Sequence, residues 1–239
     1  MREIRFYGHQ PPGFGERRLP GRLIAIEGTD GVGRSTHVAL LKEWLEARGY
    51  GVLDTGFTRS DLAGPGIQRA KQGHTLDPVT LNLFYATDFW DRLERQVLPA
   101  LKAGMVALTD RYIFSLIARA VVRGVSADWM ENLYGFAPVP DLVVYLDIDP
   151  PHLVPRVLSS TGFDYWESGQ DYLPGDSLFT NFIDYQASLL ETFRGLAAKY
   201  EFKTLDARGS VSDVFQSLCL EIEPLLREMD AEAELNEMR

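Results

Sequence analysis

The chain has 239 residues, which is enough for one α/β domain with a sizeable core and short for two. Its hydrophobic share of 45% and charged share of 24% are ordinary for a soluble globular protein. The net charge of −10 argues against a general nucleic-acid binder, because a phosphate backbone requires a basic surface; a small nucleotide needs only a few local cations. A single cysteine, Cys219, rules out an internal disulfide, and no apolar run approaches the length of a membrane span. We therefore expect a cytoplasmic protein that binds neither nucleic acid nor membrane.

Residues 1–22 are polar and contain several prolines and glycines, so they are expected to form an irregular N-terminal extension rather than a signal peptide. Short apolar runs then alternate with segments whose apolar residues recur at helical spacing. The apolar runs predict strands at 23–27, 51–55, 106–110, 141–149 and 202–207. The helical spacing predicts helices at 35–48, 77–104, 112–136, 150–161, 177–200 and 210–229.

This alternation favours right-handed crossovers and a five-stranded parallel sheet with helices on both faces. The expected organisation is one α/β domain over residues 23–229. Residues 230–239 are acidic, and they are expected to form a solvated helix end or a frayed terminus.

The segment 28–36, GTDGVGRST, stands between the first predicted strand and the first predicted helix. Its glycines allow a tight turn, and the N–H groups of the residues that follow can point at phosphate oxygens from the N-terminus of the helix. The Ser35 hydroxyl is suited to bind Mg²⁺, with Thr36 in support. This pattern favours a phosphate-binding loop over a turn without a ligand. The residues predicted to contact the nucleotide are Gly28, Thr29, Gly31, Val32, Gly33, Arg34, Ser35 and Thr36.

Position 34 is unusual, because such a loop nearly always has lysine there and this chain has arginine. Lysine brings a compact point charge to the β- and γ-phosphates, whereas arginine brings a wider planar fork. Arginine also pairs well with phosphate oxygens, so phosphate binding can survive the substitution. Arg34 is therefore predicted to be a catalytic cation.

Further motifs accompany the loop: TRS at 58–60, LFYATD at 83–88, TDRYIFS at 109–115 and LVVYLDIDPPHLVPRV at 142–157. With IEGTDGVGRST, they make residues 22–225 resemble the thymidylate kinases, P-loop enzymes that transfer a phosphoryl group from ATP to dTMP. The resemblance implies the P-loop kinase fold, ATP and Mg²⁺, and a lid at about 159–177. It also implies a homodimer built on the helices around 78–103 and 112–123.

The resemblance assigns roles on the acceptor side of the site. Asp30 would lie near the acceptor sugar and help to organise the metal and the phosphates. Arg59 would hold the acceptor phosphate, and Arg111 would bridge the donor and acceptor phosphates. Phe84 would stack on the acceptor base, and Ser115 would belong to the same substrate-binding group.

On the donor side, Ser35 and Asp110 would bind Mg²⁺ or its waters, and Arg156 would approach the donor nucleotide. Catalysis would rest on Arg34, Asp30 and Arg111, because in-line phosphoryl transfer depends on positioning and charge neutralisation.

The sequence departs from the family pattern in the parts that define its activity. Phe89 stands at the position of an arginine that helps to bind thymine, and Arg119 and Ala120 replace a Tyr-Gln pair. The lid has neither lysine nor arginine between Arg156 and Arg194. Its carboxylates Asp164, Glu167 and Asp171 are expected to repel a transferring phosphate unless a metal intervenes.

These departures leave three functions open. The first is a phosphotransferase acting on dTMP or a related nucleoside monophosphate. The second is a non-catalytic nucleotide-binding protein that keeps the fold and the phosphate loop, and the third is a kinase of a non-nucleotide acceptor.

Overall fold

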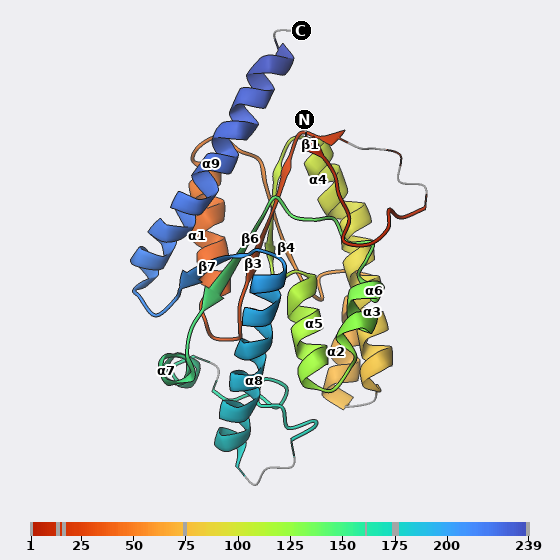
Figure 1. Cartoon of the computed structure of the whole chain (residues 1–239), viewed down its shortest axis with the longest axis vertical. Helices are drawn as coiled ribbons and strands as arrows, with labels where there is room; N and C mark the ends of the chain where they lie inside the picture. The colour runs from red at the N-terminus through yellow and green to blue at the C-terminus, as the bar shows by residue number, and fades with distance from the viewer. Residues whose placement is uncertain are drawn as a thin grey trace.

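The computed structural model describes residues 2–12, 15, 18–73, 76–160, 162–173 and 177–237. Within these ranges, five parallel strands form the central sheet in the order β4-β5-β3-β6-β7 (Figure 1). Their bounds are β3 Arg22–Glu27, β4 Val52–Gly56, β5 Val106–Asp110, β6 Leu142–Asp147 and β7 Lys203–Asp206. This architecture confirms the predicted five-stranded parallel sheet.

Alternation along the central strand divides the core into two halves. Leu23 and Ala25 of β3 face one hydrophobic cluster, whereas Ile24 and Ile26 face the other. Successive side chains of a strand point to opposite faces, so a strand that is apolar at every position requires cover on both sides.

Helices supply this cover on both faces (Figure 1). One half of the core includes side chains of α1, α7 and α9, and the other includes side chains of α3, α4, α5, α6 and α8. The helix bounds are α1 Arg34–Glu46, α2 Gly64–Gly73, α3 Pro78–Arg92, α4 Leu98–Lys102, α5 Ile113–Val122, α6 Ala127–Leu133, α7 Pro150–Leu158, α8 Leu178–Lys199 and α9 Val211–Glu237. In the described part of the chain, every helix is too short or too polar to cross a lipid bilayer.

Three helical features differ from the sequence prediction. Helix α2 was not expected, because its sequence GPGIQRAKQG is rich in helix-breaking residues; its Ile67 and Ala70 are nevertheless buried, so tertiary packing overrides propensity. A five-residue π-helix, Leu93–Val97, interrupts the long helix predicted over 77–104. The helix predicted over 112–136 is split into α5 and α6 near Gly124, whose φ of 84° ends a helix turn.

The N-terminal segment has more structure than an irregular extension. Strands β1 (Arg2–Glu3) and β2 (Arg18–Leu19) pair in antiparallel fashion. The Tyr7 ring packs edge-on against Phe114 and Tyr200, with ring centres 5.5 and 5.3 Å apart. The start of the chain therefore covers one end of the core.

Helix α9 continues through the acidic tail to Glu237 and extends beyond the sheet (Figure 1), so the described part of that tail is helical. Polar contacts between described residues help to hold this part of the helix. The Tyr50 hydroxyl donates to Asp230 at 2.7 Å, and the buried Arg22 guanidinium donates to Glu232 at 2.6 Å. Asp141 lies 3.5 Å from the other side of Arg22, whose side chain is only 2% exposed.

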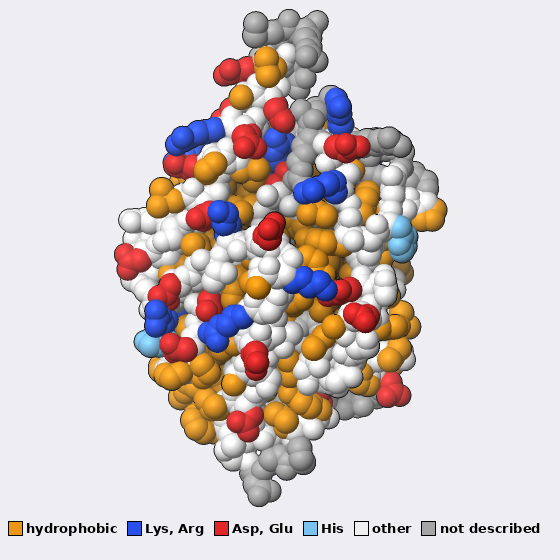
Figure 2. Space-filling model, viewed as in Figure 1, with side chains coloured by type: hydrophobic (Ala, Val, Ile, Leu, Met, Phe, Trp, Pro, Cys, Tyr) orange, Lys and Arg blue, Asp and Glu red, His pale blue; other side chains and the backbone are white. Residues whose placement is uncertain are grey.

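The surface seen in Figure 2 carries basic and acidic side chains in alternation, over the helices that face the viewer. On that face the basic groups do not merge into a continuous patch.

The ion pair between Arg22 and Glu232 generates a stability prediction. Glu232→Gln removes the negative charge beside a buried guanidinium, so we expect it to lower the free energy of unfolding by about 1–2 kcal/mol. Urea denaturation followed by circular dichroism measures the change. Glu234→Gln, two residues further along the exposed surface of the same helix, is the matched control and should unfold like the parent. Equal midpoints for the two variants would show that Glu232 contributes nothing.

Candidate active site

The parallel register of β3 and β5 sets the position of the site. Ile26 pairs with Asp110, so the loop after β3 and the turn after β5 leave the sheet side by side. Ligands of open parallel sheets bind outside the carboxyl ends of the strands, where neighbouring connections diverge. The phosphate loop and the Asp110–Arg111 turn meet at this edge.

The loop has the backbone geometry of an anion cradle. Gly31 and Gly33 have φ values of 78° and 102°, which side chains rarely adopt, and a Cβ on Gly31 would lie 2.5 Å from Val157. Helix α1 begins at Arg34, directly after this turn. The first N–H groups of a helix have no partner within it, so they are available to an anionic ligand.

Arg34 uses its planar fork to hold the loop itself. The side chain is 5% exposed. Its Nε donates to Asp110 at 2.9 Å, its Nη1 donates to the carbonyl oxygens of Gly28 and Thr29, and its Nη2 lies 3.6 Å from Asp30. A lysine ammonium could not span these partners, so the arginine is part of the architecture of the loop as well as a cation at its edge.

Ser35 and Asp110 are placed together as the metal hypothesis requires. The Ser35 hydroxyl donates to Asp110 Oδ2 at 2.8 Å. Both residues line the cavity beside the loop. Within the described ranges, no three His, Cys, Asp or Glu side chains are grouped to hold an ion. A hydroxyl and a carboxylate nonetheless fit Mg²⁺, which takes its remaining oxygen ligands from water and substrate phosphates.

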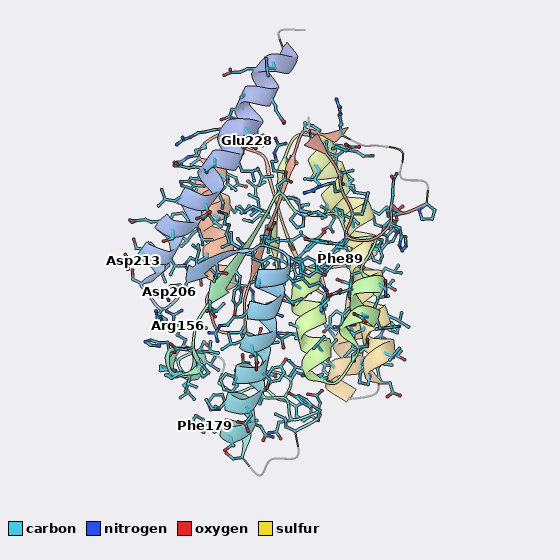
Figure 3. The ribbon with its side chains drawn as sticks, in the orientation of Figure 1. Phe89, Arg156, Phe179, Asp206, Asp213 and Glu228 are labelled. Atoms are coloured by element: carbon cyan, nitrogen blue, oxygen red, sulfur yellow. The ribbon has the colours of Figure 1, made fainter. Side chains whose placement is uncertain are left out.

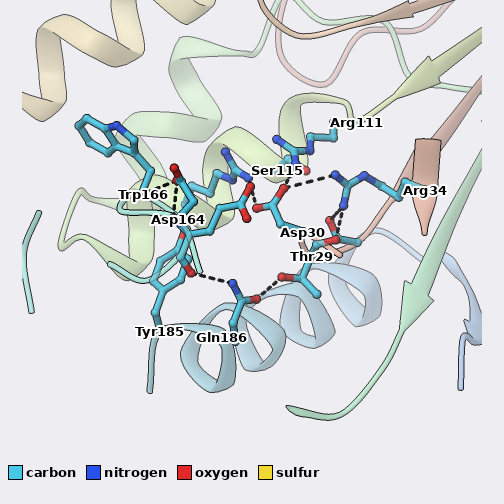
Figure 4. A network of polar contacts seen from close by, with 12 residues as sticks. Thr29, Asp30, Arg34, Arg111, Ser115, Asp164, Trp166, Tyr185 and Gln186 are labelled. Carbon is cyan, nitrogen blue, oxygen red and sulfur yellow. Dashed lines mark hydrogen bonds and ion pairs between the residues drawn. The ribbon is translucent and has the colours of Figure 1, made fainter. Parts of the chain in front are cut away.

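Asp30 is the centre of a cluster of arginines (Figure 4). Its carboxylate forms ion pairs with Arg34, Arg111 and Arg119. Arg111 has a left-handed backbone, with φ of 73°, which turns its side chain back toward the loop. Burial, together with the nearby charge of Arg119, lowers the pKa of Arg111 to about 9. The cluster therefore concentrates positive charge at the mouth of the phosphate loop.

Two adjoining cavities lie beyond this cluster. The cationic cavity, about 200 Å³, is lined by the basic residues Arg34, Arg59, Lys71, Arg111 and Arg119 and by Asp110. The apolar cavity, about 220 Å³, has walls that include Leu81, Tyr85, Leu116, Ala120 and Trp166. Lys71, Tyr85, Leu116 and Arg119 line both and mark the junction between them.

Arg59 reaches the cationic cavity because a buried carboxylate fixes its loop. Asp88 accepts hydrogen bonds from the backbone N–H groups of Thr58 and Ser60 at 3.1 and 3.0 Å. Asp88 is also paired with Arg92 at 3.0 Å. Arg59 lies 2.9 Å from Asp54 and is 45% exposed, so its guanidinium can reach a ligand that enters the cavity.

Of the two adjacent aromatic residues in the LFYATD motif, Tyr85 rather than Phe84 lines the cavities. Tyr85 lines both cavities, whereas the Phe84 ring lies against Gly66 of α2 and is 39% exposed. The position of Tyr85 is therefore the better suited of the two to stack on a base, which had been expected of Phe84. The LFYATD motif does not reveal this, because only the rotation of α3 in the fold decides which ring faces inward.

The hydroxyl of Ser115, which was predicted to belong to the substrate-binding group, lies in the core. It is 1% exposed and donates to Glu27 at 2.5 Å. Glu27 additionally accepts hydrogen bonds from the N–H groups of Tyr112 and Ser115 at 2.8 and 3.1 Å. This buried carboxylate at the end of β3 thus binds the N-terminus of α5 and fixes the turn that carries Arg111.

Phe89, which stands in place of the thymine-binding arginine expected from the resemblance, lies away from both cavities. It is 4% exposed and packs among Tyr112, Tyr134 and Phe136. Figure 3 shows Phe89 among the helices on the other side of the molecule from Arg156. Phe89 therefore helps to fill the core.

Several cavity residues were not assigned from the sequence: Lys71, Tyr85, Arg119 and Arg123. Lys71 comes from the unexpected helix α2, and its ammonium lies 5.6 Å from the centre of the Trp166 ring. Leu116, Arg119 and Arg123 recur at helical spacing on α5, and this spacing was the signal that could have placed them on one face.

Arg123 secures the lid segment over the apolar cavity. Its guanidinium donates to Asp171 at 2.7 and 3.0 Å, to the Trp166 carbonyl at 2.9 Å and to the Tyr185 hydroxyl at 3.0 Å. The negative charge of Asp171 is thus paired, which reduces the repulsion of a phosphate expected from this residue. Gln186 links the lid to the loop, since it donates to the Glu167 carbonyl and accepts from the Thr29 hydroxyl (Figure 4).

A third cavity, about 330 Å³, lies on the other side of the phosphate loop between α1 and α7. Thr36, His37, Arg156 and Val211 are among its lining residues. Arg156 donates to the carbonyl of Val32 at 3.2 Å and to those of 208 and 209 at 3.3 and 3.2 Å. Figure 3 shows Arg156 beside α7, with Asp206 next to it at the end of β7. Arg156 therefore joins the phosphate loop to the far wall of this α1–α7 cavity.

The buried Glu27 predicts a pH-dependent stability. Burial raises the pKa of Glu27 from 4.5 to about 7, against the hydrogen bonds from Ser115 and Tyr112. Between these values the folded state binds the proton and the unfolded state releases it. The contribution of Glu27 to stability is therefore complete below pH 4.5 and is lost as the pH rises through 7.

Glu27→Gln should remove this pH-dependent contribution to stability. Relative to the variant, the parent should lose on the order of 2 kcal/mol of unfolding free energy between pH 4.5 and 7, as measured by urea denaturation across the range. Glu43→Gln, on the exposed surface of α1, should follow the parent. A Glu27→Gln profile parallel to that of the parent would contradict the raised pKa.

Comparison with known proteins agrees with this geometry. The Thymidylate kinase family model matches residues 26–218. A probable thymidylate kinase 2 of Saccharolobus solfataricus is 37% identical over 198 residues, which cover 82% of this chain and 92% of the relative. A probable thymidylate kinase of Thermococcus kodakarensis is 31% identical over 86% of this chain and 99% of its own. Because the match spans most of the chain and includes both the phosphate loop and the Asp110–Arg111 turn, the chain belongs to the thymidylate kinase family.

Proposed function

We propose that the protein transfers the γ-phosphoryl group of ATP to dTMP and forms ADP and dTDP. The observation that carries this proposal is the position of the phosphate loop, between the α1–α7 cavity on one side and the cationic and apolar cavities on the other. A donor base would lie in the α1–α7 cavity beside Arg156. The acceptor base would lie in the apolar cavity and its phosphate in the cationic cavity.

Transfer in this arrangement depends on positioning and on neutralisation of charge. An oxygen of the acceptor phosphate forms a bond to the γ-phosphorus while the bond to the β–γ bridging oxygen breaks. Arg111, held by its left-handed turn, would lie between the two phosphates, and Arg59 would hold the acceptor phosphate. Ser35 and Asp110 would bind Mg²⁺, which neutralises charge on the donor phosphates when present. Asp30 keeps the guanidinium groups in place before the substrates arrive.

A coupled assay for ADP, with chromatographic identification of dTDP, tests the proposal. Turnover with ATP and dTMP is expected, and dUMP and dCMP in the same assay define the base preference. Nucleotide binding without turnover would instead identify a non-catalytic relative. One observation favours that second function: the Arg34 guanidinium already donates hydrogen bonds to Asp110 and to the carbonyls of Gly28 and Thr29.

We further propose that the protein is a homodimer formed through the outer face of α3. Val79 and Leu83, one turn apart on this helix, are 50% and 46% exposed, and Leu62 of the preceding loop is 69% exposed. Such an apolar surface favours a protein partner. Helix α5, which the sequence also suggested, is a poor candidate, because residues 113–118 are buried within the chain itself.

Arg34 provides a prediction for the loop. Arg34→Ala should lower kcat on the order of 10²-fold, because it removes a preorganised charge from a developing anionic centre. Arg34→Lys should also lower kcat, by about 10-fold or more, because an ammonium cannot hold Asp110 and the loop carbonyls together and misplacement by ~1 Å can cost about 10²-fold. The coupled assay measures both, with the exposed Arg227→Lys as the control. A faster Arg34→Lys enzyme would show an ordinary loop that has drifted from lysine.

Tyr85 provides a prediction for the acceptor base. Tyr85→Ala should raise the KM for dTMP about 10-fold or more and leave the KM for ATP unchanged, because an aromatic platform contributes about 1–3 kcal/mol to base stacking. Tyr85→Phe should retain most of the affinity. Phe84→Ala, at the neighbouring outward-facing position, separates the two assignments. A selective loss in Phe84→Ala with none in Tyr85→Ala would restore the assignment made from the sequence.

A further inference from the structure

Arg119 occupies the junction between the two acceptor cavities. It lies on the face of α5 that carries Leu116 and Arg123, and it lines both the cationic and the apolar cavity. Its Nη2 is paired with Oδ2 of Asp30, and its side chain is 22% exposed. A ligand that fills both cavities must pass this guanidinium.

Within the cluster, three arginines share the single carboxylate of Asp30, and Glu167 and Glu27 also act on Arg111 from further away. Arg34 shares its charge between Asp30 and Asp110, which leaves Arg111 and Arg119 paired with the same carboxylate. The two guanidinium groups repel each other, and burial first, with this repulsion second, lowers the pKa of Arg111. Partly buried cations that share one counter-ion are stabilised by a further anion. The arrangement therefore favours an anionic ligand between them.

The lid offers no cation for this position. Its sequence has neither lysine nor arginine from 157 to 193, and the lid carboxylate of Asp171 is held by Arg123, one turn beyond Arg119 on α5. Positive charge on this side of the acceptor site comes from α5 and from Lys71 of α2.

We propose that Arg119 is a catalytic residue that leaves Asp30 and binds the acceptor phosphate when the acceptor enters. This inference rests on the proposed function, since it assumes an acceptor whose base fills the apolar cavity. With the base there, the sugar spans the junction and the phosphate lies in the cationic cavity, which Arg119 also lines. The guanidinium then holds the oxygens that do not attack, so that the remaining oxygen is directed at the γ-phosphorus.

Calorimetric titration of the whole protein with dTMP and with thymidine isolates the contribution of the acceptor phosphate to the binding free energy. Arg119→Gln should weaken dTMP binding about 10- to 100-fold, the range for a hydrogen bond between charged groups, and leave thymidine binding unchanged. Arg119→Lys should recover part of the loss. Arg227→Gln removes one positive charge from a distant exposed site and should match the parent.

Thermal unfolding without ligand distinguishes this role from a structural one. In Arg119→Gln, Asp30 can still form its ion pairs with Arg34 and Arg111. The repulsion between Arg111 and the side chain at position 119 is removed. Arg119→Gln is therefore expected to unfold at the midpoint of the parent or above it. A lowered midpoint without selective loss of dTMP affinity would show that Arg119 only supports Asp30. An equal loss of affinity for dTMP and thymidine would show that Arg119 contacts the base or the sugar. Either result overturns the inference.

The outcomes also separate the inference from the proposed function. A parent that turns over dTMP while Arg119→Gln binds it equally well refutes the role of Arg119 and leaves the kinase activity intact. A parent that neither binds nor phosphorylates dTMP refutes the proposed function, and the inference falls with it.

Discussion

The Asp30 carboxylate determines how the site is arranged, because it holds guanidinium groups that come from separate parts of the chain. Arg34 belongs to the start of α1, Arg111 to the turn after β5, and Arg119 to the middle of α5. Their charges would repel one another across the cavity without a shared counter-ion. With Asp30 in place, the cations are gathered at the mouth of the phosphate loop before any phosphate arrives. Preorganised charge of this kind requires little rearrangement during the reaction.

The arginines of the cationic cavity are supported by buried carboxylates that have no direct part in the proposed transfer. Glu27 fixes the first turn of α5 and so the position of Arg111, and Asp88 fixes the loop that carries Arg59. Each accepts hydrogen bonds from backbone N–H groups, which restricts loops that would otherwise vary in conformation. The rigidity of the site therefore derives from the layer of residues behind the cavity.

The lid is integrated with the same framework. Arg123 binds the lid through Asp171 and the Trp166 carbonyl, and Gln186 connects the lid backbone to Thr29 of the phosphate loop. A lid without its own cations can thus be complementary to a site whose cations stand on α2 and α5. The acidic composition of the lid, considered alone, suggested repulsion of phosphate. The ion pair with Arg123 neutralises one of the lid carboxylates, that of Asp171.

The local sequence determined the parallel sheet, the phosphate loop and the family, because strand patterning, glycine spacing and the DRY motif depend on residues that are close together in the chain. It did not determine α2, whose Gly- and Pro-rich sequence becomes helical only through packing of Ile67 and Ala70, or the choice between Phe84 and Tyr85, which depends on the rotation of α3. Ser115 likewise belongs to a motif, but only its distance to Glu27 shows that it serves the core. The grouping of Arg34, Arg111 and Arg119 on Asp30 was decided by the tertiary structure alone, because ion pairs between residues up to 89 positions apart exist only once the sheet has brought their strands and helices together.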